Sequence, residues 1–299
     1  MKVELPESGI YVAAVSGGVD SMALLHMLQA RRVAEGDNPI TIIVAHLDHG
    51  IREDSIEDRE LVQFVAMAYG MPFVYDEANL GEKASEALAR QRRYEFLEKV
   101  MQNSLAEGII TAHHEDDAIE TAIMNIARGS GRKGLTSLGD NDKLLRPLIK
   151  VSKKDLRQYA VDNDLLWRED STNADTKYRR NHVRHNVVAK FDPAAKRELA
   201  SIIHKTRLTN TEIDNILNDL LDEHVSDGKL NKHWLIDLPH NVGKEVIAAW
   251  LRKSELRDFD KKTLERLIVG AKVAKPGSKI EIVKNVKMKV AKDSLEIVR

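Results

Sequence analysis

The 299-residue sequence contains no cysteine. Disulfide bonds, thiolate metal sites and chemistry that passes through a persulfide or a thioester are therefore excluded. Long apolar runs are also missing, since the longest ones, such as residues 40–45, are far too short to cross a membrane. No signal peptide is visible at the N-terminus. We therefore expect a cytoplasmic protein.

A strong overall charge bias is absent as well, because the formal net charge is −1. The charge is nevertheless distributed unevenly along the chain. Residues 143–190 contain 12 Lys or Arg against 6 Asp or Glu, and residues 271–299 contain 8 against 3. An ordinary solvated surface would explain either region alone. Two basic regions in a nearly neutral chain favour a polyanionic partner.

A strand–turn–helix pattern at residues 10–31 carries the first functional signal. Residues 10–15 form a short apolar run, and residues 19–31 contain no Pro or Gly, which favours a helix. The turn between them would point backbone N–H groups outward at a helix N-terminus, where anions bind. The Walker pattern GxxxxGK[ST] is absent. The pattern predicts a pyrophosphate-binding loop with a candidate magnesium ligand, Asp20, and the loop comprises Ser16, Gly17, Gly18, Val19, Asp20 and Ser21.

Apolar strands and amphipathic helices alternate through the first half of the chain. Further strands are predicted at residues 40–47, 72–75 and 108–112, with helices at 55–69, 84–101 and 115–127. This alternation predicts a parallel sheet flanked by helices. A glycine-containing basic loop is expected at residues 129–134. A helix is expected at 153–163, a mainly helical region beyond residue 193, and a small β element at 279–298.

Polar clusters follow two of the predicted strands, where open α/β sheets place their ligands. They contain His46, Asp48 and His49, and His113, His114, Asp116 and Asp117. A dinuclear metal hydrolase is one reading of these residues, although such an enzyme would not need a glycine-rich phosphate loop. Asp117 and Glu120 share a helix face and could hold an ammonium group. Acidic residues are also common in the first turn of a helix.

Two arginines of the helix expected at residues 84–101 form a further candidate site. Arg90 and Arg93 lie on one helix face, with Tyr94 adjacent. Guanidinium groups at this spacing suit contacts to phosphate or adenine. A solvated helix face has the same spacing, so this pattern alone leaves both interpretations open.

Together, seven motifs resemble those of the tRNA(Ile)-lysidine synthetase family of N-type ATP pyrophosphatases. They run in order through residues 10–190 and are SGGVDS at 16–21, HLDHGIR at 46–52, ARQRRY at 89–94, TAHHEDDAIET at 111–121, ARGSGRKGL at 127–135, RPLI at 146–149 and REDSTNADTKYRRNHVR at 168–184. The resemblance implies a Rossmann-like (adenine nucleotide alpha hydrolase-like) sheet. It is weaker after residue 200, where the further C-terminal domain of longer members is expected to be missing.

The resemblance also implies an activity. ATP would adenylate C2 of the wobble cytidine in a CAU-anticodon tRNA(Ile) with release of pyrophosphate, and free L-lysine would then displace AMP to form lysidine. ATP would be a substrate, and Mg²⁺ would assist. A homodimer is left open.

Residue roles follow from the same resemblance. Asp20 and Asp117 would be catalytic, and Asp20 would also hold the metal. The SGGVDS loop, His46, Arg90 and Arg93 would bind ATP. The lysine amine would contact Asp117 and Glu120, and its carboxylate would face Arg180 or Arg184. The tRNA would contact Arg128, Arg132 and Lys133.

Two domains are expected from the length and from the family pattern. Residues 1–192 would form the catalytic domain, and residues 193–299 a helical linker with a small C-terminal domain that contacts tRNA. Three rival functions share parts of the pattern. They are tRNA 2-thiolation, which needs cysteines that this sequence lacks, amidation of a small nucleotide or acid, and tRNA binding without catalysis.

Overall fold

The computed structural model describes residues 3–6, 8–34, 40–50, 55–81, 84–139, 143–169, 179–257 and 259–299. The end of the HLDHGIR motif, at residues 51–52, and residues 170–178 of the REDSTNADTKYRRNHVR motif lie outside this range. The chain divides into two compact units, residues 1–207 and 208–299. Each unit has its own hydrophobic core.

Unit 1 is built on the predicted parallel sheet. Its strands lie in the order β3-β2-β1-β4-β5, and every adjacent pair is parallel. In the central strand, Val12 lies opposite Ile43 on one side and Ile109 on the other. The fifth strand was not predicted, because two residues are too few to form a pattern. The strands are β1 (Ile10–Ala14), β2 (Thr41–Asp48), β3 (Phe73–Glu77), β4 (Gly108–Thr111) and β5 (Leu144–Leu145).

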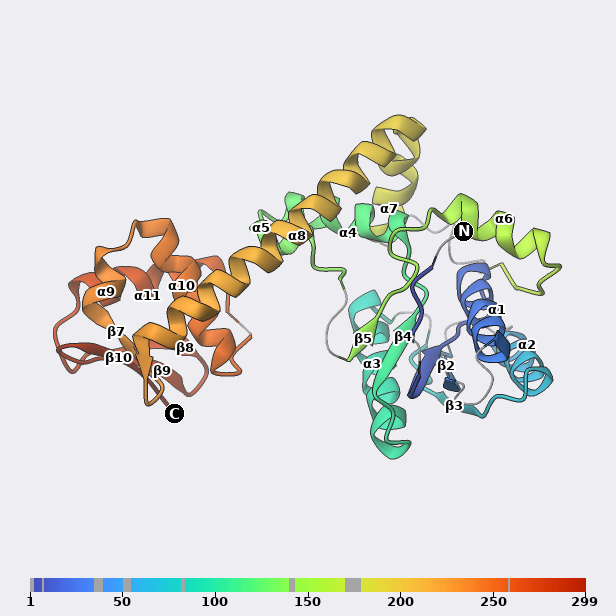
Figure 1. Ribbon diagram of the computed structural model, residues 1–299, viewed down its shortest axis with the longest axis horizontal. Coiled ribbons are helices and arrows are strands. Elements are labelled where there is room, and N and C mark those ends of the chain that lie inside the picture. The colour runs from blue at the N-terminus through green and yellow to red at the C-terminus, as the bar shows by residue number, and fades with distance from the viewer. Residues whose placement is uncertain are drawn as a thin grey trace. The chain divides into compact units, whose positions relative to one another are not determined.

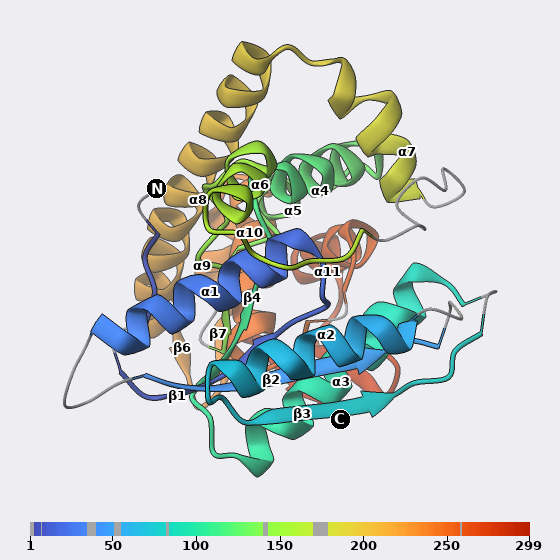
Figure 2. The same ribbon diagram turned by 90° about the vertical axis from the view of Figure 1, so that its right-hand side faces the viewer.

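Helices cover both faces of this sheet. Side chains alternate along a strand, so Ala13 packs in one core with α1 (Val19–Ala34), α2 (Ser55–Ala68) and α6 (Lys153–Asp162). Val12 packs on the opposite face with α3 (Glu86–Asn103). Figure 1 shows α1 and α2 on one side of the sheet and α3 on the other. Figure 2 shows α2 lying over β2 and β3. The predicted α/β fold is confirmed.

A second helical group follows β4. Its members are α4 (Glu115–Ala127), α5 (Arg132–Leu135), α7 (Arg179–Asn186) and the 3₁₀ turn η2 (Val188–Lys190), with the first part of α8 (Pro193–His224). Ile119, Val183, Val188 and Ile203 form a core shared by α4, α7, η2 and α8. The helix α5 lies within the segment that was expected to be a loop. The helix α7 was not predicted, because its sequence RRNHVRHN contains one apolar residue.

The division between the units falls inside α8, after the expected boundary at residues 192/193. Leu199, Ala200 and Ile203 in the first part of α8 pack against the core around Ile119. These contacts hold that part of the helix in unit 1.

Unit 2 contains the rest of α8, three helices and an antiparallel sheet in the order β6-β7-β10-β9-β8. The side chain of Trp250 is 1% exposed in its core. The β element expected at 279–298 is three strands of this sheet. The elements are β6 (Val225–Ser226), β7 (Lys229–Asn231), α9 (Lys232–Asp237), α10 (His240–Lys253), α11 (Lys261–Val273), β8 (Lys279–Val283), β9 (Val286–Val290) and β10 (Ser294–Val298). No helix in the described part of the chain has the length and apolar character needed to span a bilayer.

Candidate active site

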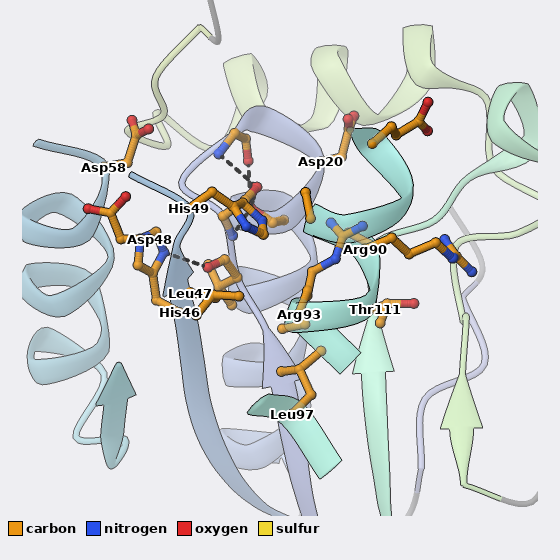
Figure 3. A pocket seen from close by; sticks show the side chains of 18 of the residues that line it. Asp20, His46, Leu47, Asp48, His49, Asp58, Arg90, Arg93, Leu97 and Thr111 are labelled. Carbon is orange, nitrogen blue, oxygen red and sulfur yellow. Dashed lines mark hydrogen bonds between the residues drawn. The ribbon is translucent and has the colours of Figure 1, made fainter. Parts of the chain in front are cut away.

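A cavity of about 500 Å³ opens at the carboxyl ends of the central strands. The chain leaves β1 toward β2 on one side and returns at β4 on the other, which is the switch point where open α/β sheets bind ligands. His46 and Asp48 from the end of β2 line this cavity together with Thr111 and His113 from the end of β4. Figure 3 shows Arg90 and Arg93 on one side of it, across from His46, Asp48 and Asp58.

The loop between β1 and α1 is closed by its two serines. The Ser16 N–H donates to Oγ of Ser21 over 3.2 Å, and the Ser21 hydroxyl donates to the Gly18 carbonyl over 2.9 Å. The Met22 N–H also donates to the Gly18 carbonyl, at 3.0 Å. The amides that precede Met22 belong to the first turn of α1, whose N–H groups have no intrahelical acceptor. The loop therefore presents backbone donors at the positive end of a helix.

The predicted loop residues divide into two groups. Ser16, Gly18, Asp20 and Ser21 line the cavity, whereas Gly17 and Val19 do not. The Val19 side chain is 5% exposed and belongs to the core. Gly17 has a φ of +89°, so its role is to make a turn that other residues adopt only with strain.

Arg168 and Asp58 support this loop, and neither was predicted. The Arg168 N–H donates to the Gly17 carbonyl over 3.0 Å. Its guanidinium Nε lies 2.9 Å from Oδ1 of the buried Asp58, and it also pairs with Glu57. The sequence gives no sign of the contact between Arg168 and Asp58, because these residues are 110 positions apart.

The arginines of α3 lie on the cavity side of that helix. The Arg90 guanidinium stands 4.9 Å from the centre of the Tyr94 ring. Burial lowers the pKa of Arg93, although a guanidinium stays protonated at neutral pH. Among the described residues Arg93 has no ion-pair partner. It is thus a cation available to an anionic ligand.

Three of the histidines at the strand ends, His46, His49 and His113, have lowered pKa values. Burial lowers the pKa of His46, whose Nδ1 lies 2.9 Å from the Val15 carbonyl and donates to it. Burial, together with the charge of Arg93, lowers the pKa of His49 to about 4. Burial likewise lowers the pKa of His113 to about 3.

The geometry does not favour a dinuclear metal centre. Asp48 accepts hydrogen bonds from the Gly50 N–H at 2.8 Å and from the Ser55 hydroxyl at 3.0 Å, so both its oxygens are engaged. Across the described ranges, no three His, Asp or Glu side chains are grouped so that they could hold a metal ion.

His114 lies between two carboxylates that come from different motifs. Its Nε2 is 3.5 Å from Oδ2 of Asp20 and 3.4 Å from Oδ2 of Asp117. Burial opposes the charged imidazolium, but Asp117 and Asp20 outweigh it and raise the pKa of His114. Burial raises the pKa of Asp20, but His114 and Lys153 outweigh it, and the net shift is downward. The Oδ1 atom of Asp20 is buried and has no partner among the described residues.

Asp117 and Glu120 form a closed ion cluster with Arg180 and Arg184. Arg180 lies 3.0 Å from both carboxylates, through Nη2 to Asp117 and through Nε to Glu120. Arg184 places Nε 2.6 Å from Oε1 of Glu120. Burial raises the pKa of Asp117, but His114, Arg180 and His113 outweigh it, so that the pKa falls to about 2. The sequence predicted that these two carboxylates bind the amine of lysine. In the structure both of them form ion pairs with arginines of the same chain.

Exposure distinguishes the members of this cluster. Glu120 is 1% exposed and does not line the cavity. Asp117, Arg180 and Arg184 line it. The cluster therefore contacts the cavity through one carboxylate and two guanidinium groups.

The predicted tRNA contacts lie away from the cavity lining. Arg128 is the exposed C-cap residue of α4. Arg132 and Lys133 belong to α5 and are half-buried. None of the three lines the cavity.

The parallel sheet and the serine–glycine loop define an ATP-binding α/β protein, and residues 2–191 match the family model of the PP-loop domain. The chain therefore belongs to the tRNA(Ile)-lysidine synthase family of PP-loop proteins. It is 33% identical over 263 residues to a tRNA(Ile)-lysidine synthase of Gloeobacter violaceus, covering 82% of this chain and 77% of that one.

Other relatives are longer. The tRNA(Ile)-lysidine synthase of Thermotoga maritima is 31% identical over 231 residues, which cover 74% of this chain and 55% of the relative. That of Lactiplantibacillus plantarum is 32% identical over 284 residues, which cover 89% and 62%. The chain thus spans about 55–62% of the length of these two relatives.

A solved structure shares the fold. A U34-tRNA thiolase from Methanococcus maripaludis superimposes with a TM-score of 0.54 at 15% identity, over 67% of this chain and 73% of the other.

Proposed function

We propose that this chain ligates L-lysine to C2 of the wobble cytidine in a CAU-anticodon tRNA(Ile), with cleavage of ATP to AMP and pyrophosphate. The observation that carries the proposal is the position of His114 between Asp20 of the loop and Asp117 of the ion cluster. This contact supports two adjacent half-sites, one for ATP and one for the amine. The relatives named tRNA(Ile)-lysidine synthase support the choice of substrate.

In the first step, the cytosine O2 attacks the α-phosphorus of ATP and pyrophosphate leaves. The loop amides and the Ser16 and Ser21 hydroxyls would bind the phosphates, because preorganised donors stabilise the developing charge. Arg93, a cation without an ion-pair partner in the described residues, would pair with a phosphate.

Asp20 is the proposed magnesium ligand. Its buried Oδ1 lacks a partner in the described part of the chain, and magnesium commonly takes one or two carboxylates together with substrate phosphates. When bound, the ion would neutralise charge on the departing pyrophosphate.

In the second step, the lysine ε-amine attacks C2 and AMP leaves. Free lysine has a pKa near ~10.4, so only about one molecule in a few thousand is an amine at neutral pH. A carboxylate must hold and orient the ammonium. Asp117 suits this role, because it is the cluster carboxylate that lines the cavity.

Lysine entry would require an exchange of partners. Arg180 and Arg184 engage the carboxylates that we assign to the ammonium. The α-carboxylate of the incoming lysine would draw one guanidinium away, because a planar guanidinium binds carboxylates in a bidentate manner. The ammonium would then take the vacated oxygen, so that every buried charge keeps a partner.

The tRNA would contact the basic surfaces outside the cavity. We also propose that the protein acts in the cytoplasm. The target base must leave its stack, which costs a few kcal/mol and calls for phosphate contacts elsewhere. Arg128, Arg132 and Lys133 would supply such contacts from unit 1. The Lys-rich strands of unit 2 would add others.

The test uses the full chain with labelled lysine, ATP and magnesium. We expect label in a CAU-anticodon tRNA(Ile) and none in elongator tRNA(Met). Equal labelling of both, or no lysine-dependent labelling, would refute the proposal.

A further inference from the structure

A second cavity, of about 290 Å³, lies on the other side of α4. It is formed by Glu115 and Ala118 of α4, by residues 149–150, and by α8 residues between Arg197 and Arg207, all within unit 1. Residues three apart share a helix face, whereas Asp117 is rotated about 200° from Glu115. One helix therefore carries the ion cluster on one side and this second cavity on the other.

The lining of the second cavity is cationic. It includes Lys150, Arg197 and Arg207, against the single carboxylate Glu115. The side chains of Lys150 and Arg197 are exposed, and within the described ranges neither has an ion-pair partner. Three cations and one carboxylate leave a charge of about +2, which matches a phosphate group.

Two polar groups add directional donors. Nη2 of Arg207 donates to the Leu138 carbonyl over 2.9 Å, which anchors that guanidinium at the cavity. Nδ1 of His204 is buried and has no hydrogen-bond partner among the described residues. The residue itself lines the cavity, so its ring adds a polar group to the lining.

The rest of the lining is apolar apart from Ser201. Ala118, Ile149, Ala200 and Ile203 form the floor beneath the cations, and Ile149 and Ile203 are 8% and 5% exposed. An apolar floor lowers the local dielectric constant and strengthens each charge–charge contact. The cavity thus combines apolar side chains with three cations.

We propose that this cavity binds a phosphate group. Its cationic donors come from two separate segments, Lys150 before α6 and Arg197 and Arg207 of α8, so they can approach different oxygens of one phosphate group. The group could be a backbone phosphate of an RNA substrate or a free phosphate ion. Binding of an RNA phosphate rests on the proposed function, whereas binding of a free phosphate ion does not depend on it.

The test compares two double variants of the full chain. Lys150→Ala with Arg197→Ala removes two cations of the cavity. Lys154→Ala with Lys205→Ala removes two exposed lysines that do not line it. All four side chains are exposed, so both variants should fold, and thermal unfolding checks this.

Two binding measurements follow, without ATP or lysine. Inorganic phosphate is titrated by calorimetry, and a CAU-anticodon tRNA(Ile) transcript is titrated at several salt concentrations. We expect the cavity variant to lose phosphate affinity by about tenfold or more, as expected for charged hydrogen bonds. If RNA is the source, tRNA affinity also falls and the salt slope decreases by about 2. If the free ion is the source, tRNA affinity stays unchanged.

The proposal is overturned if the cavity variant binds both phosphate and tRNA as its control does. Lysine incorporation is measured separately. If wild-type protein incorporates no lysine, the proposed function is refuted, but the phosphate-binding result still stands.

Discussion

Nε of Arg184 lies 2.6 Å from Oε1 of Glu120, a carboxylate whose residue is 1% exposed. The other oxygen of Glu120 accepts from Nε of Arg180 at 3.0 Å. One buried carboxylate therefore connects two arginines of α7 to α4. Removing one member of such a cluster leaves uncompensated charge in a site from which water is largely excluded.

Glu120→Gln should lower the free energy of unfolding by about 2–3 kcal/mol, because it leaves both guanidinium groups without this counter-charge. Urea denaturation measures the change. Glu95→Gln is the matched control, since Glu95 pairs with Arg92 at an exposed position of α3, and we expect a loss below about 0.5 kcal/mol. Equal losses in the two variants would contradict the structural role of Glu120.

The stability contributed by Asp117 should depend on pH. Its pKa is lowered from 3.8 to about 2 in the folded protein. A lowered folded-state pKa stabilises the protein above the unfolded pKa, and this contribution is lost as pH falls from about 4 to 2. The stability difference between wild type and Asp117→Asn should therefore shrink by about 2 kcal/mol across that range.

Denaturation at several pH values measures this difference. Asp162→Asn, at an exposed site of α6, should differ from wild type by no more than about 0.5 kcal/mol throughout. A constant difference for Asp117→Asn would show that its ion pairs do not lower its pKa.

Arg93→Ala should weaken ATP binding about 10- to 100-fold, because it removes a charged donor from the cavity. Arg92→Ala changes the neighbouring residue, which is exposed and outside the cavity lining. Calorimetric titration of ATP compares the two. Unchanged ATP affinity in Arg93→Ala would exclude a phosphate contact by this arginine.

Gly17→Ala should destabilise the protein by about 1–2 kcal/mol, because alanine is strained at a φ of +89°. Lack of space is not the cause, because a Cβ here would lie at an ordinary contact distance, 3.4 Å, from Cβ of Asp58. Gly18→Ala is the control in the same loop, where a Cβ would meet only Oγ of Ser16 at 3.6 Å. Thermal unfolding distinguishes them, and equal melting temperatures would show that the turn does not require glycine.

The sequence was sufficient to predict β1 to β4 and the helices around them. Apolar runs such as residues 40–47 are long enough to be recognised as buried strands. Glycine residues such as Gly70 mark the ends of the helices that follow. The fifth strand, Leu144–Leu145, has no period because it contains two residues. The helix α7 is almost entirely polar, and its one apolar residue, Val183, packs in a core with residues of α4, η2 and α8.

The residues of the candidate site were easier to predict than their partners. The predicted nucleotide residues other than Gly17 and Val19 line one cavity with Asp117, Arg180 and Arg184. Residue type alone could not show that Glu120 would be enclosed by two arginines. Arg168 was missed as a loop partner, because a contact across 110 residues leaves no local pattern.

The Arg168 N–H bond to the Gly17 carbonyl has a consequence for biosynthesis. A ribosome adds about 5–20 residues per second. Residue 168 is the 151st residue added after residue 17, so it follows roughly 8–30 seconds later. During that interval the nascent strand, turn and helix exist without the amide that caps Gly17. The loop between β1 and α1 can thus gain this hydrogen bond only after the segment that follows α6 has been made, long after its own residues.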